Sequence, residues 1–351
     1  MSVRPSTLPC VRQRGATLLV GAIVLLLLVI AAFDGVSVPY VALVPGPTWN
    51  TLGIDQNKEI ITISGGTVSA PKGQLRMVTV GVQDHITLWE AIQGWLSSDD
   101  AVVPREVIYP PNQTRQQVDQ ENQQEFKSSQ NAAIVAALRE LGFPVHVVVT
   151  DLPADSPSQG KLRKGDEIDS IDGQPVTSGQ KLTTLIRSRP VGTALTIAYK
   201  RGGVPATTTV STIAASDKTP RIGIQIDEQQ PSPYSISISL DNVVGPSAGL
   251  MFSLGIVDKL KSTDLTDGRT IAGTGTIDEE GNVGAIGGIP QKMRGARRDG
   301  ATVFLAPASN CAEATANAVP GLKLVKVATL ADALRALDTL RSGGTPALCS
   351  R

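Results

Sequence analysis

The longest run of apolar positions lies near the start of the chain, where Ala16–Phe33 contains 18 apolar or small residues and no charge. A helix of this length is just long enough to span a bilayer. Three arginines precede the run, and no acidic residue occurs before Asp34. Because positive flanks stay cytoplasmic, the pattern predicts a cytoplasmic N-terminus over residues 1–15 and a single transmembrane signal anchor over residues 16–38 in the cell membrane.

A cleaved signal peptide is the alternative interpretation, because its apolar core also follows positive charge. The run is longer than the roughly 7–15 residues usual for such a core, and Ala31-Ala32 is a weak cleavage site. We therefore favour a retained anchor in contact with the lipid bilayer. Both interpretations place the bulk of the chain beyond the membrane, in an extracytoplasmic location.

Shorter patterns follow over residues 39–141 and predict an α/β region. Alternating or apolar segments predict strands at 36–44, 60–63 and 77–80, and amphipathic spacing predicts a helix at 86–96. The polar, glutamine-rich stretch 110–131 predicts either an exposed helix or a flexible arm, which leads into a helix ending before Gly142. The role of this region stays open. One arrangement packs it beside the last domain, with the next module inserted between two halves of one unit.

Residues 142–213 have the pattern of a small β-rich module. A strand at 145–150, a helix at 179–186 and a hairpin formed by 193–199 and 206–212 are predicted from alternation and from the Gly pair at its turn. Residues 214–222 then form a polar linker.

The last domain is predicted over residues 222–341, followed by a flexible tail over 342–351. Strict alternation predicts strands at 222–226 and 234–240, and the second leads into a small-residue turn and an apolar run with helical spacing. Further strands are predicted at 270–276 and 283–286, around an acidic turn at 278–280 that we interpret as a solvated hairpin tip. The whole chain is thus predicted to be α+β, with an N-terminal transmembrane helix.

Composition narrows the possible functions. Lysine plus arginine and aspartate plus glutamate are both 32, and aromatic residues make up 3%, so no nucleic-acid surface is indicated. The three cysteines, Cys10, Cys311 and Cys349, have neither metal-ligand spacing nor the number expected of a disulfide framework. No phosphate-binding loop of the Gly-x-x-x-x-Gly-Lys-Ser/Thr type occurs in the sequence, which argues against ATP hydrolysis by this chain. We expect no cofactor and no metal.

Ser247 is the candidate nucleophile, because it lies in the Gly/Pro turn that opens the apolar helix. Backbone N–H groups at a helix start are free to hold an anion, although serine there is also a common N-cap. A nucleophilic serine needs a base, and neither histidine, His85 or His146, lies in the last domain. The remaining candidate is Lys292, two residues after Pro290 at a predicted helix start. Burial and the helix dipole would both favour its neutral form.

The motif Gly245-Pro246-Ser247-Ala248-Gly249 and the segment 275–292 resemble the proteolytic domain of Lon proteases. The resemblance implies that Ser247 is the nucleophile and Lys292 the general base, with Thr274 hydrogen-bonded to the lysine. It also implies an oxyanion site at the backbone of Gly245, Pro246 and Ala248, protein or peptide substrates, and a homo-oligomer, since Lon-type domains form hexameric rings. The acidic residue common before this motif is Val244 here, and the nearest carboxylate in sequence is Asp241.

The segments Leu162–Ile168 and Ile171–Val176 resemble bacterial PDZ domains. PDZ domains add an extended peptide to a sheet edge and bind its carboxylate at a loop of backbone N–H groups. The resemblance implies such a loop at Gly142, Phe143 and Val145, before the first strand. The sequence as a whole predicts a membrane-anchored, ATP-independent serine endopeptidase. The alternative is a membrane-tethered PDZ adaptor with an inactive Lon-like domain.

Overall fold

The computed structural model describes residues 18–25 and 36–350, except residue 242. Residues 18–25 are helical and exposed. Of the predicted anchor, residues 16–17 and 26–35 lie outside the described residues. Within the described residues, no helix combines the length and the apolar character needed to cross a membrane.

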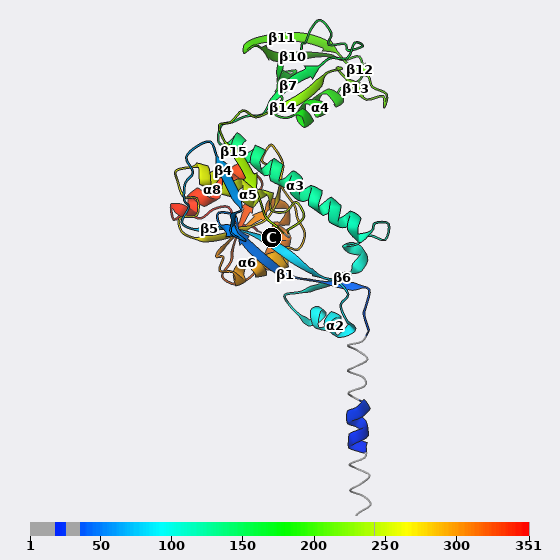
Figure 1. Cartoon of the computed structure of the whole chain (residues 1–351), viewed down its shortest axis with the longest axis vertical. Coiled ribbons are helices and arrows are strands. Elements are labelled where there is room, and N and C mark those ends of the chain that lie inside the picture. The colour runs from blue at the N-terminus through cyan, green and yellow to red at the C-terminus, as the bar shows by residue number, and fades with distance from the viewer. Residues whose placement is uncertain (1–17, 26–35, 242, 351) are drawn as a thin grey trace, which may run out of the picture.

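A six-stranded mixed sheet forms the centre of the larger unit (Figure 1). Its strands, in spatial order, are β20 (Lys323–Val327), β19 (Val303–Pro307), β16 (Thr270–Gly273), β5 (Gln74–Gln83), β1 (Tyr40–Asn50) and β6 (Ala101–Pro104). The first four are mutually parallel, while β1 and β6 join by antiparallel pairing. Segments from both ends of the sequence therefore build one sheet, with the module of the middle segment inserted between them.

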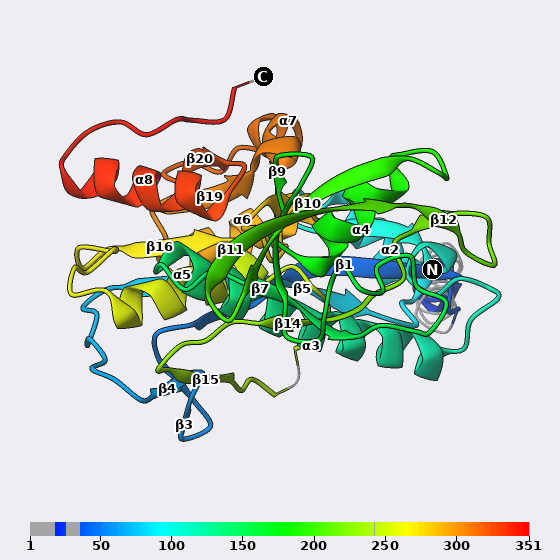
Figure 2. The same ribbon diagram turned by 90° about the horizontal axis from the view of Figure 1, so that it is seen from above.

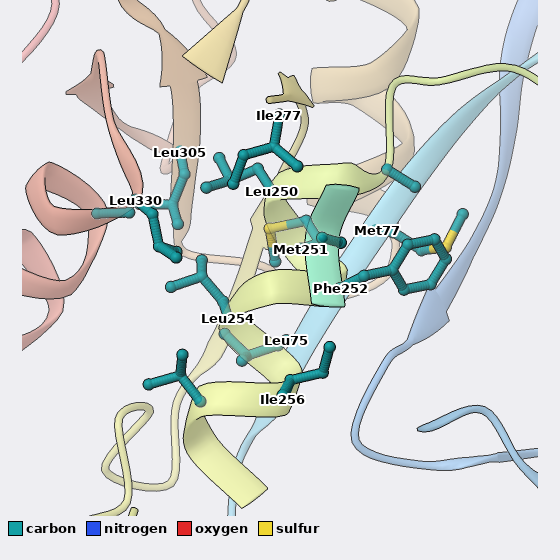
Figure 3. Close-up of a cluster of buried hydrophobic side chains, with 14 of the residues drawn as sticks. Leu75, Met77, Leu250, Met251, Phe252, Leu254, Ile256, Ile277, Leu305 and Leu330 are labelled. Carbon is teal, nitrogen blue, oxygen red and sulfur yellow. The ribbon is translucent and has the colours of Figure 1, made fainter. Parts of the chain in front are cut away.

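Alternation along the strands supplies two apolar faces, and helices cover both. Met77 and Leu305 face the helices α3 (Arg115–Glu140), α5 (Gly249–Leu260) and α8 (Leu330–Arg341), as Figure 3 shows for part of this cluster. Their neighbours Val78 and Phe304 face α6 (Ile289–Arg298) and α7 (Cys311–Ala316) on the other side. Helix α5 is buried all round, because sheet and helices enclose it.

The larger unit also contains several short elements. Helix α2 (Leu88–Leu96) packs beside β1 and β6, close to its predicted range. The strands β4 (Ile61–Ser64) and β15 (Ser235–Ile238) pair at one end of the unit (Figure 2). The remaining short elements are β2 (Ile54–Asp55), β3 (Lys58–Glu59), η1 (Arg105–Val107), β17 (Thr276–Ile277), β18 (Val283–Gly284) and η2 (Ala308–Asn310).

The inserted module is a second sheet with one helix. Its main strands are β11 (Val204–Ser211), β10 (Ala194–Arg201), β8 (Glu167–Ile171), β7 (His146–Asp151) and β14 (Gln225–Gln229), in that order. The helix is α4 (Gly179–Arg187), and the short strands are β9 (Gln174–Pro175), β12 (Ile213–Ala214) and β13 (Pro220–Arg221).

Strand β14 corrects the sequence prediction, which gave the strand at 222–226 to the last domain. The chain turns back through β12 and β13, and β14 pairs antiparallel with β7 at the edge of the module. The isoleucines Ile222, Ile224 and Ile226 pack on the module's core. The predicted strand at 222–226 overlaps β14 only at its last two residues, because residues 222–224 are not in a strand. Pairing across some 75 residues is not visible in local sequence.

The polar stretch 110–131 is not a flexible arm. It forms the first part of α3, a single helix that begins with a capping box of Thr114 and Gln117. Two prominent apolar side chains, Phe126 and Leu138, are buried. The helix is therefore stabilised by its packing against α5 and not by an amphipathic pattern alone.

Two predictions about the C-terminus are wrong. Cys311 and Cys349 form a disulfide with an Sγ–Sγ distance of 1.95 Å. The tail is also not flexible, because Lys326 N donates to Ala347 O and Cys349 N donates to Leu324 O. The tail thus lies along β20 and reaches the start of α7. The two cysteines are 38 residues apart in sequence, and this spacing alone does not predict a disulfide.

Candidate active site

The turn around Ser247 is held from outside by helix α3. Gly245 N donates to Asn122 O at 3.0 Å, and Ser129 Oγ donates to Pro246 O at 2.9 Å. Gly245 has φ +86°, a conformation that favours glycine. The N-cap of α5 is Ala248, and no side chain caps this helix. The Ser247 hydroxyl is therefore not used as a cap, and Ser247 is half-buried.

Lys292 lies in the first turn of α6, after the left-handed Gly288 and Pro290. It is only 4% exposed. Burial lowers the pKa of its ammonium to about 8, although the charge of Glu313 opposes the shift. A neutral amine is thus available at mildly alkaline pH, as a general base requires.

Thr274 links the lysine to the serine turn. Lys292 Nζ donates to Thr274 Oγ1 at 3.3 Å, and Thr274 Oγ1 donates to Ser247 O at 3.0 Å. Gly275 N also donates to Ser247 O, at 2.9 Å. The serine backbone is therefore fixed by two donors from the strand end that also contacts the lysine.

Ser247 and Lys292 line one cavity of about 380 Å³, which we call the serine cavity. The predicted oxyanion residues Gly245, Pro246 and Ala248 line it as well. Of these three, only Ala248 has an available N–H, because Gly245 N already donates to Asn122 O and proline has no N–H. Much of its remaining wall is aliphatic, formed by Leu43, Met77, Val80, Val82, Ile108, Val243 and Val244. Within the described part of the chain, the N–H groups of Ser247 and Ala248 donate no hydrogen bond. They are free to bind an oxygen that carries developing negative charge.

Neither histidine reaches this cavity. His146 Nδ1 lies 2.5 Å from Glu167 Oε1 within the module, and His85 is exposed beside Asp84. Asp241 is exposed and does not line the cavity either. Across residues 18–25 and 36–350, leaving out 242, no cluster of three or more His, Cys, Asp or Glu could hold a metal ion. The chemistry available at the site is that of a serine and a buried lysine.

Sequence reasoning missed the residues that position this pair. Ser129 and Asn122 lie more than 100 residues before the serine, in a stretch without a recognisable motif. Asn310 holds the segment before α6, because its Oδ1 accepts from Ile286 N and its Nδ2 donates to Ile286 O. Only the assembled fold brings these side chains to the site.

A second cavity, of about 400 Å³, lies between α4 and β14 and is called the α4 groove here. It is lined by Leu182, Thr183 and Ile186 of α4 and by residues 219–226. Gly223 has φ +67°, and a Cβ there would lie 2.7 Å from Ser156 Oγ. Among the described residues, the N–H groups of Gly223 and Ile224 donate no hydrogen bond. Strand β14 is the edge of its sheet.

The residues predicted for peptide binding, Gly142, Phe143 and Val145, lie elsewhere. They join the end of α3 to β7, and none of them lines the α4 groove. The Phe143 ring packs edge-on against Tyr234, and Val145 is buried. The loop with free N–H groups at a sheet edge follows the module's hairpin in sequence, whereas we expected it before the first strand.

Comparisons with known proteins find two families, although the PDZ match begins inside α3 and ends before β14. Residues 239–337 match the family model of the Lon protease (S16) C-terminal proteolytic domain, and residues 117–212 match that of the PDZ domain. Lon protease 2 of Bacillus subtilis is 31% identical over 108 residues, which cover 30% of this chain and 19% of the relative. Lon protease 1 of the same organism is 28% identical over 156 residues, with 43% and 20% covered.

The chain thus spans about a fifth of the length of these curated relatives. A solved PDZ domain of the SdrC-like protein from Listeria monocytogenes is 32% identical, covering 23% of this chain and 85% of that structure with a TM-score of 0.22. The family matches and the Lon relatives support a Lon-type serine protease domain joined to a PDZ domain in one chain.

Proposed function

We propose that this protein is a membrane-anchored, ATP-independent serine endopeptidase that cleaves extracytoplasmic proteins with a Ser247–Lys292 dyad. One observation carries the proposal: a buried lysine whose pKa is lowered to about 8 shares a cavity with a serine at a helix start. A lysine without a catalytic task is almost never fully buried unless it is paired. Lys292 has a threonine hydroxyl as its hydrogen-bond partner, and that hydroxyl also holds the serine turn.

In the first half-reaction, Ser247 Oγ attacks the scissile carbonyl carbon while neutral Lys292 takes the hydroxyl proton. The N–H groups of Ser247 and Ala248 bind the oxyanion that forms. The Lys292 ammonium then protonates the leaving amine, the carbon–nitrogen bond breaks, and an acyl ester remains on Ser247.

In the second half-reaction, water replaces the amine. Neutral Lys292 removes a proton from the water as it attacks the ester, and the proton passes to Ser247 Oγ as the carbon–oxygen bond breaks. Thr274 keeps the lysine amine in place in both halves through its hydrogen bond. The aliphatic wall of the serine cavity would exclude water from the amine and keep its pKa low.

The α4 groove is the proposed site for substrate tails. An extended peptide would pair with the free edge of β14, and its carboxylate would bind the N–H groups of Gly223 and Ile224. This replaces the location first expected at Gly142, Phe143 and Val145. Recruitment by the groove would raise the local concentration of substrate near the serine cavity.

The anchor and the extracytoplasmic location rest on the apolar run and its arginine flank. The disulfide between Cys311 and Cys349 supports the same location, because disulfides persist in oxidising compartments. A hexameric ring is proposed on resemblance alone.

Labelling with a fluorophosphonate, together with cleavage of an unfolded test protein, tests the dyad. The full chain should become labelled and cleave the protein, and Ser247→Ala and Lys292→Met should do neither while keeping the wild-type melting temperature. Cleavage retained by Ser247→Ala would exclude the dyad. If the wild-type chain binds peptides but neither labels nor cleaves, the membrane-tethered adaptor becomes the better description.

A further inference from the structure

Helix α2 carries three large apolar side chains that are about half exposed or more. Trp89 is 49% exposed, Trp95 54% and Leu96 83%, and we call these three residues the α2 patch. Ala91 is buried in a small cluster with Ala42 and Ile86. Trp89 and Leu96 share one face of the helix, whereas Trp95 lies one turn after Ala91, at the border of the buried side. The buried side chains fix helix α2 to the unit, while its three large apolar side chains are exposed. Soluble proteins rarely expose a large apolar patch without a binding partner.

The α2 patch lies directly beside the point where the chain enters the folded unit. Leu88 N donates to Val36 O at 2.9 Å, and Val38 N donates to Ile86 O at 3.1 Å. The apolar run ends at Phe33, three residues before Val36. Three residues span at most about 11 Å, so the first turn of α2 cannot be far from the end of the run. Helix α2 also lies at the end of the larger unit opposite the inserted module (Figure 1).

The chemistry of the α2 patch suits the boundary between lipid headgroups and acyl chains. Tryptophan is enriched at that boundary because its ring is apolar and its N–H is polar. The Trp95 ring packs edge-on against Tyr40 at 5.6 Å, which fixes its orientation without covering it. The helix carries one charge, Glu90, and no lysine or arginine, so attraction to anionic headgroups does not contribute.

We infer that the α2 patch inserts into the interfacial layer of the bilayer that holds the anchor. This rests on the proposed anchor, and it adds a second, independent contact with lipid. Two contacts with the bilayer would fix which side of the unit faces the membrane.

Quenching of tryptophan emission by brominated lipid tests this inference on the full chain. The protein is placed in phosphatidylcholine vesicles with or without bromine on the acyl chains. Two of the three tryptophans lie on α2, and Trp49 packs against the core, so bromine should remove up to about two thirds of the emission. The double variant Trp89→Phe/Trp95→Phe should lose none. Adding Ile54→Trp to that variant supplies an exposed tryptophan on β2 that should also stay unquenched.

Flotation of the vesicles and labelling of Ser247 separate this inference from the proposed function. Protein that floats and labels but is not quenched would leave the anchor and the dyad intact and overturn the inference. Protein that does not float would overturn the anchor and the inference together. Emission that depends on protein concentration and not on bromine would assign the α2 patch to a second copy of the chain, which also overturns it.

Discussion

The serine cavity and the α4 groove have similar volumes, about 380 and 400 Å³, but the chain assembles them in different ways. The reactive residues of the serine cavity lie 45 positions apart inside one domain and carry local signatures. The α4 groove combines helix α4 with β14, and four other strands lie between these two elements in the chain. Local sequence motifs can point to reactive residues. A groove between elements that are distant in sequence can be found only from the topology of the fold.

The largest expected effect distinguishes the serine cavity from the α4 groove, because only the serine cavity requires a general base. Lys292→Arg should lower kcat by about 10²–10⁴-fold, because a guanidinium stays protonated and cannot act as the base. In the wild type, activity should rise with pH through about 8, as Lys292 loses its proton. Binding of a C-terminal peptide to the α4 groove should not change. A pH–rate profile that is flat between pH 7 and pH 9 would argue against the lysine.

The next prediction concerns the pH dependence of stability in the core of the larger unit. Asp258 is buried in the larger unit without a cation, and burial raises the pKa of its carboxyl to about 6. Its neutral form stabilises the unit at acidic pH, and this contribution is lost as pH rises through about 6. Asp258→Asn should therefore raise the free energy of unfolding at pH 8 by up to about 3 kcal/mol. Thermal unfolding from pH 4 to pH 8 measures it, and equal curves for both proteins would contradict the assignment.

The module should respond to pH in the opposite direction. Burial alone would raise the pKa of Asp166, but hydrogen bonds from the Arg201 guanidinium and Arg163 N–H hold it below its usual value. Stability from this carboxylate is present above its unfolded pKa and is lost as pH falls through the lowered one. Hydrogen exchange followed separately in β8 and α5 would resolve the two units, with Asp258→Asn changing α5 alone.

The smallest effect tests the α4 groove by filling it. Thr183→Trp should weaken binding of a peptide with a free C-terminus by about tenfold or more, equal to about 1.4 kcal/mol. Thr184→Trp is a matched control, because both hydroxyls donate to the carbonyl four residues earlier, but Thr184 is exposed and does not line the groove. Fluorescence anisotropy measures the binding. Equal affinities for the two variants would place peptide binding elsewhere.

Much of the fold followed from pattern, and the exceptions share a cause. The strands, the helices around Leu88 and Gly179, and the apolar helix after the serine agree with alternation and helical spacing. Turn chemistry and the scarcity of histidine make Ser247 and Lys292 candidates, and the resemblance to the Lon proteolytic domain is what assigns their roles. The disulfide, the place of β14 and the positioning roles of Ser129 and Asn310 depend on contacts between distant segments, which no local pattern encodes.

Helix α3 gives the two sites a common rigid frame. Its 26 residues span about 39 Å, and the Asn122 carbonyl and Ser129 hydroxyl that hold the serine turn lie about two turns apart on it. Near its end, Arg139 Nη2 donates to Thr177 O, just before α4. Inserting one residue between Ser129 and Arg139 would turn the far end by about 100° relative to the serine turn. The rotation along a single helix thus sets the orientation of the α4 groove relative to the serine turn.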